Sequence, residues 1–106
     1  MNTFKNAGAA IGTSRTTIYT TPAATQTVIH ALYISNIDGV NDASVTIEVT
    51  VDGGTTYRHI AKTVSVSADA TLILDKPINM EAGDILGLTA SVDGDLEVFA
   101  SILEIS

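Results

Sequence analysis

Apolar and polar residues alternate along most of this chain from Thr16 to its end. In residues 43–51, three valines and an isoleucine fall on one face of an extended strand, while threonine and glutamate residues fall on the other. Successive side chains of a strand point to opposite faces, so a period of two indicates one face in a core and one in solvent. The pattern therefore predicts β-structure throughout this part of the chain.

The same alternation defines a series of short segments separated by turns. The predicted strands cover residues 16–20, 27–37, 43–51, 55–61, 64–74, 85–92 and 96–105, and the segment 64–74 is expected to bend or split at residues 67–69. Asp-Gly pairs at 38–39, 52–53 and 93–94 mark turns, because both residues tolerate the positive φ of tight hairpins. About eight such strands predict an all-β chain folded as an antiparallel two-sheet sandwich, jelly-roll-like or Greek-key.

Two of these segments are apolar on both faces. Residues 27–37 are expected to form a strand that is central or covered on both sides. In residues 96–105, Val98 and Ala100 share one face, and Phe99, Leu103 and Ile105 share the other. A final strand with two apolar faces predicts that one of them meets another subunit.

Residues 1–15 do not follow the alternation. Glycines at positions 8 and 12 favour neither helix nor strand, so the segment is either a frayed terminus or an extended arm that docks on a neighbouring subunit through Phe4 and Ile11. We divide the chain into an N-terminal arm, residues 1–15, and a β-sandwich domain, residues 16–106. Deleting residues 2–15 is expected to leave a folded domain that no longer assembles.

Composition narrows the possible functions. A chain of 106 residues is one domain with a single core. It has no cysteine, which excludes disulfides and thiolate metal sites. The net charge of −7 argues against nucleic acid as a partner, and no stretch approaches the ~20 apolar residues of a membrane span. The start of the chain also lacks the apolar core of a secretory signal, so synthesis in the cytoplasm is expected.

The sequence contains no convincing reaction centre. His30 and His59 lie outside any metal-ligand spacing, and no nucleophile elbow occurs. The carboxylate pairs at residues 38/42 and 93/95 could attract a cation, but aspartate is also a preferred turn residue. We predict no catalytic, cofactor-binding or metal-binding residue.

Arg58, His59 and Lys62 form the one local basic cluster. These charges either blunt an edge strand or make ionic contacts with an acidic patch on the next subunit. Carbohydrate sites usually present exposed aromatic residues, and here there is no tryptophan and the three tyrosines are scattered. A small carbohydrate-binding module remains an alternative.

Four segments together resemble a known class of proteins. They are TIYTTPA (17–23), VIHALYISN (28–36), LDKPINMEAGD (74–84) and the terminal ILEIS (102–106). In this order the chain is similar to the small β-sandwich accessory virion proteins of tailed bacteriophages and prophages. The resemblance implies a symmetric homo-oligomer, often a trimer, bound to a larger assembly, and it implies no catalytic residue.

The expected function is a non-enzymatic structural component of a tailed-phage virion. A head decoration (cement) protein that stabilises the capsid is favoured, with a neck, collar, tail or fibre-base part as the alternative. The partners would be copies of the chain, with a trimer favoured, and the major capsid or other virion proteins, with assembly in the host cytoplasm. The candidate contact residues are Phe4, Ile11, Arg58, Lys62, Phe99, Leu103 and Ile105.

Overall fold

The computed structural model describes residues 1–106. The chain forms nine β-strands joined by turns and loops, and it contains no helix. The strands are β1 (Asn2–Ile11), β2 (Thr16–Thr20), β3 (Gln26–Asn36), β4 (Ala43–Thr50), β5 (Tyr57–Val66), β6 (Thr71–Leu74), β7 (Ile78–Met80), β8 (Ile85–Ala90) and β9 (Leu96–Ile105). The prediction of an all-β chain is confirmed. No helix with the length and hydropathy of a membrane span is present.

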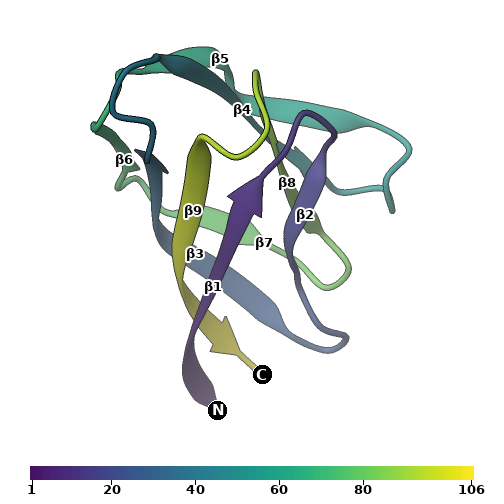
Figure 1. Ribbon diagram of the computed structural model, residues 1–106. Coiled ribbons are helices and arrows are strands. Elements are labelled where there is room, and N and C mark those ends of the chain that lie inside the picture. Colours follow the sequence, from purple (N-terminus) through teal and green to yellow (C-terminus); the bar gives the residue numbers. More distant parts are fainter.

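The strands form two antiparallel sheets that face each other (Figure 1). The first sheet has the order β1-β9-β3-β6, with β7 also paired to β3, and the second has the order β2-β8-β4-β5. Apart from the β4–β5 hairpin and the β6–β7 link, each connection passes from one sheet to the other. These connections are compatible with the predicted antiparallel two-sheet sandwich.

The core lies between the sheets and follows the alternation of the sequence. Strand β4 shows this most clearly, because Val45 and Ile47 are fully buried and face the apolar side chains of the other sheet. In all, 17 buried hydrophobic residues form one cluster. Strand β3 keeps its inward face across a bulge at His30, so that Ile29 and Leu32 both point into the core.

The structure replaces the predicted N-terminal arm with strand β1. Residues 2–11 pair with β9 of the same chain over ten consecutive positions, without a register shift. Ile11, expected on a docking surface, is fully buried in the core. The pairing satisfies the backbone groups on one edge of β9, which would otherwise be exposed. Residues 2–11 therefore belong to the sandwich, and the boundary at residue 15 does not separate an arm from a domain.

Four connections gather at one end of the sandwich, where Ile37 N–H donates to the Asp95 carbonyl at 2.8 Å and Thr13 N–H donates to the Asp93 carboxylate at 2.7 Å. Asn36 closes this end from inside, because its side-chain amide donates to the carbonyls of Asn41 and Val66. We call this region the acidic loop end, after its carboxylates Asp38, Asp42, Asp69, Asp93 and Asp95.

Candidate assembly surface

Three large apolar side chains form a row across the outer face of the first sheet. Phe99 of β9 pairs with Tyr33 of β3, which pairs with Ile73 of β6. Their exposed fractions are 49%, 39% and 54%, although β9 and β3, which carry Phe99 and Tyr33, are inner strands of the sheet. Residues directly opposite on neighbouring strands have Cβ atoms about 5 Å apart, so the three make one continuous ridge. We call it the aromatic row.

A hollow lies beside the aromatic row on the side of β1. Its volume is about 380 Å³, and it is lined by Gly8, Ala9, Ala10, Tyr33, Ser35, Glu97, Val98 and Phe99. It exists because Gly8 pairs with Phe99 but has no side chain to extend the row. A Cβ atom at Gly8 would lie 3.9 Å from the Phe99 ring, which is ordinary contact. We call this feature the Gly8 hollow.

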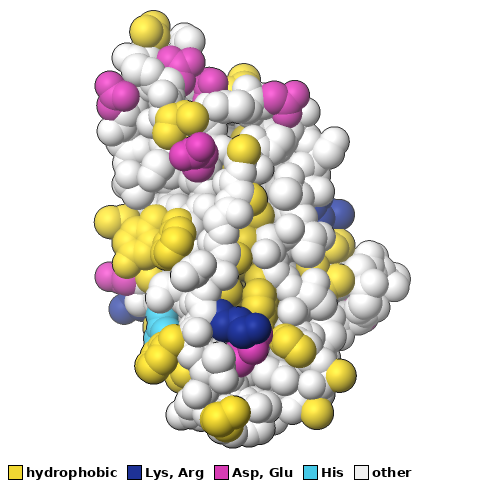
Figure 2. Space-filling view, turned by 60° about the horizontal axis from the view of Figure 1, so that its bottom comes forward, with side chains coloured by type: hydrophobic (Ala, Val, Ile, Leu, Met, Phe, Trp, Pro, Cys, Tyr) yellow, Lys and Arg dark blue, Asp and Glu magenta, His cyan; other side chains and the backbone are white.

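The same outer face continues toward the chain termini. Phe4 of β1 is 80% exposed and stacks on His30, with ring centroids 6.5 Å apart. Leu103 pairs with Phe4, and Ile105 lies two residues further along the same face of β9. Figure 2 shows a group of hydrophobic side chains on one face of the molecule, with others scattered over the rest of that face.

The structure brings together four of the seven predicted contact residues and separates the other three. Phe4, Phe99, Leu103 and Ile105 share the outer face of the first sheet. Ile11 lies in the core, and Arg58 and Lys62 lie on β5 at an edge of the other sheet. The alternation within residues 27–37 could have identified Tyr33 as outward-facing, but only the strand register reveals that Tyr33 and Ile73 continue the row from Phe99.

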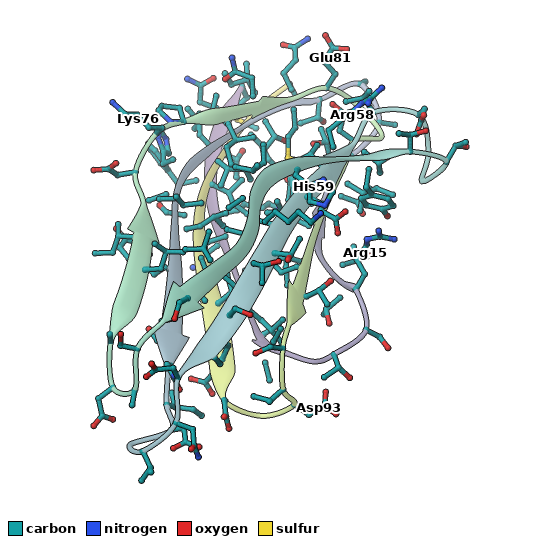
Figure 3. All side chains as sticks on the ribbon, turned by 90° about the horizontal axis from the view of Figure 1, so that it is seen from above. Arg15, Arg58, His59, Lys76, Glu81 and Asp93 are labelled. Carbon is teal, nitrogen blue, oxygen red and sulfur yellow. The ribbon has the colours of Figure 1, made fainter.

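A second cluster, unexpected from the sequence, covers the outer face of the other sheet. The Glu48 carboxylate is buried between Arg15 (Nε–Oε1 3.2 Å) and His59 (Nε2–Oε2 3.5 Å). The Arg15 guanidinium lies 3.7 Å from the centroid of the Tyr57 ring. Figure 3 shows Arg15 and His59 on the same side of this sheet.

Gly87 makes the route of the Arg15 side chain possible. A Cβ atom at Gly87 would lie 2.9 Å from Arg15 Cγ, which is closer than real Cβ contacts allow. The arginine therefore crosses β8 over a glycine to reach Glu48. A buried carboxylate requires such a paired cation, and His59 lies beside the resulting Arg15–Glu48 ion pair.

The carboxylates of the acidic loop end act within its turns. Backbone N–H groups of Asn41 and Val40 donate to Asp38 and hold the pKa of its carboxyl below the usual range. Burial, and then the neighbouring charge of Asp38, raise the pKa of Asp95. The structure contains no group of three or more residues placed to hold a metal ion. The hydrogen bonds of Asp38 are those of a turn-forming aspartate.

Tyr19 joins the two sheets near the chain termini. Its hydroxyl donates to the Glu104 carboxylate and contacts the Thr27 hydroxyl at 3.0 Å. Burial, and then the hydrogen bond to Glu104, raise the pKa of Tyr19 to about 12. The hydrogen bond to Glu104 raises this pKa because a phenolate would lose the bond and face a carboxylate of the same charge.

The raised pKa predicts a loss of stability in alkali. Folding favours the protonated phenol, so this contribution is complete below the ordinary pKa of 10.0 and disappears as the pH rises toward about 12. The free energy of unfolding, measured with urea between pH 9 and pH 12, should therefore fall less in the Tyr19→Phe variant than in the parent protein. Tyr57→Phe is the control and should keep the parental fall; an unchanged fall in Tyr19→Phe would contradict the assignment.

Comparison with known proteins found similar solved structures but no matching protein family. No protein-family model matches the chain, and no curated protein sequence matches it. The structure is similar to one described for Bacillus endospore appendages, a family of disulfide-linked pili, with a TM-score of 0.62 and 13% identity over 100% of this chain and 87% of the other. It was also matched to a pentameric capsid protein from metagenomic phage sequences, with a TM-score of 0.49 and 24% identity over 93% of this chain and 59% of that one. The first likeness shows a shared fold.

Proposed function

We propose that the chain is a non-enzymatic structural subunit that contacts copies of itself and the proteins of a larger assembly. The aromatic row carries this proposal, because Phe99, Tyr33 and Ile73 remain about half exposed in the single chain. A contiguous apolar patch on a small soluble domain is typical of a protein-contact surface. Covering it would remove apolar area from water, at roughly 25 cal/mol per Å².

The resemblance seen in the sequence supports a place for this subunit in a tailed-phage virion. We propose a head decoration (cement) protein on the major capsid protein, with a neck, collar, tail or fibre-base part as the alternative. Many weak contacts repeated by symmetry would hold such subunits in place. The likeness to a pilus subunit supports a role in assemblies by analogy of fold. Since this chain has no cysteine, its contacts would be non-covalent.

A carbohydrate-binding module is the second candidate. It is favoured by one observation, the exposed rings of Tyr33 and Phe99 beside a hollow that also contains Ser35 and Glu97. Aromatic faces and nearby polar groups are what a sugar ring requires. Binding to a glycan array that disappears in Tyr33→Ala would support this candidate against the virion role.

Immunogold labelling tests the virion role directly. An antibody against the protein should label tailed-phage particles made by cells that encode it, with gold over the head for a decoration protein and over the neck or tail for the alternative. The double variant Phe99→Ser and Tyr33→Ser should reduce particle occupancy at least about tenfold, since central aromatic residues dominate interfaces. Ile60→Ser is a matched control, because Ile60 is 46% exposed but lies on β5 of the other sheet. Particles without label would overturn the proposal.

A further inference from the structure

The four sheet edges differ in their ability to accept another strand. Strand β2 has a register shift between Thr17 and Tyr19, and β5 has two such shifts. The edge formed by β6 and β7 is interrupted by the Asp75–Pro77 link. Bulges, proline and charge are devices that block edge pairing. Strand β1 has none of these interruptions over ten residues and carries a single charge, on Lys5.

Hydrogen bonds at the chain ends show which backbone groups of β1 are free. The Ser106 N–H donates to the Met1 carbonyl at 3.0 Å, and Met1 N donates to the Ser106 carbonyl, so Met1 and Ser106 form a hydrogen-bonded pair. Such pairs alternate in an antiparallel ladder. Odd-numbered residues of β1 therefore bond to β9. The N–H and C=O groups of Asn2, Phe4, Asn6, Gly8 and Ala10 therefore point away from β9, toward the free edge of the sheet.

We propose that β1 pairs antiparallel with β1 of a second copy, which joins the two first sheets into one. Only residues with outward N–H and C=O groups can bond, so even-numbered residues must face even-numbered ones. With Ala7 at the two-fold axis, Asn6 faces Gly8 of the second copy and Phe4 faces Ala10 of the second copy. Each exposed Phe4 ring then covers the other copy's Gly8 hollow, whose wall includes Ala10.

Charge favours this arrangement of two identical chains. Antiparallel pairing places the two acidic loop ends at opposite ends of the joined sheet, where they do not repel each other. Figure 3 shows Asp93 at the opposite end of the molecule from Glu81 and Arg58. Lys5 would face Ala9 of the second copy, and its own amine lies 3.7 Å from Glu104. The result is a two-fold pair and not the trimer that the resemblance implies.

Single cysteines test the register, because the natural chain has none. At the two-fold axis the two copies of residue 7 form a non-hydrogen-bonded pair with Cα atoms about 4.5 Å apart, which a disulfide can span. Ala7→Cys treated with diamide should therefore give a disulfide-linked dimer. Ala9→Cys is the matched control. Ala9 is half-buried on the same face as Ala7, but its Cα atom would lie roughly 13 Å along the strand from that of Ala9 in the second copy. Equal cross-linking of both variants, or none in Ala7→Cys, would overturn the pairing.

Proline at an outward position tests the pairing without a cross-link. Asn6→Pro removes an N–H that β9 does not use, so the fold should survive and the edge should be blocked. Light scattering on a size-exclusion column should give twice the chain mass for the parent and for Asn6→Ala, and one chain mass for Asn6→Pro. A parent that is monomeric or trimeric, or a folded Asn6→Pro that stays dimeric, would contradict the inference. These results do not depend on a larger particle, so they separate this inference from the proposed function.

Discussion

Replacing Leu32 by alanine is expected to lower the free energy of unfolding by about 3 kcal/mol. Leu32 lies at the centre of β3, fully buried, with Ala100 of β9 on one side and Leu74 of β6 on the other. Truncation removes buried methyl groups and leaves a cavity that two paired neighbouring strands cannot close. Urea unfolding followed by far-ultraviolet circular dichroism measures the difference.

The neighbouring residue supplies the control for this prediction. Tyr33 follows Leu32 in the chain but points outward in the aromatic row. Its replacement by alanine loses cross-strand contacts with Phe99 and Ile73, which are worth up to about 1 kcal/mol. A loss in Tyr33→Ala as large as that in Leu32→Ala would show that the two faces of β3 have been assigned incorrectly.

Deletion of residues 2–11 is expected to abolish cooperative folding of the single chain. The deletion removes Ile11 from the core, which alone costs about 2–5 kcal/mol, and leaves ten residues of β9 without a partner on one edge. A small domain has only about 5–15 kcal/mol of stability in total. The expected results are loss of the thermal transition and aggregation through the exposed edge of β9.

A surface substitution in the same strand separates this effect from a general sensitivity of β1. Phe4→Ser changes an 80% exposed side chain and keeps every backbone hydrogen bond of the strand. Measured at a protein concentration where both proteins are monomeric, its unfolding free energy should stay within about 0.5 kcal/mol of the parent. If the deletion variant instead melts cooperatively at the parental temperature, residues 2–11 are the detachable arm that the sequence predicts.

The predicted strands that agree best with the structure are those in which apolar and polar residues alternate without a break. Residues 43–51 were expected to be half-buried, and β4 covers Ala43–Thr50 with its valines and isoleucine inward. The expected break at residues 67–69 also lies where β5 ends and β6 begins. Both features follow from local chemistry, because side-chain alternation and turn propensity act over a few residues.

Strand β1 is not predicted because its sequence shows little alternation of apolar and polar residues. Its segment Ala7–Ala10 contains only alanine and glycine, so inward and outward positions look alike in the sequence. Its conformation comes from β9, whose free edge needs a hydrogen-bonding partner. The Glu48 cluster was missed for a related reason, since Arg15, Glu48 and His59 are far apart in the chain and meet only when β4, β5 and β8 are in register.

Side-chain alternation and turn residues are enough to predict that the chain is all-β, where most turns fall, and that Phe99, Leu103 and Ile105 share one face of the last strand. Strand pairing in the folded chain is what reveals that β1 completes the first sheet, that Tyr33 and Ile73 extend Phe99 into the aromatic row, and that Ile11 is buried. The physical reason is the range of the interactions. Alternation is fixed by the geometry of a single strand. Pairing and register depend on hydrogen bonds and side-chain contacts between residues far apart in the chain, such as Phe4 and Leu103, which are 99 positions apart.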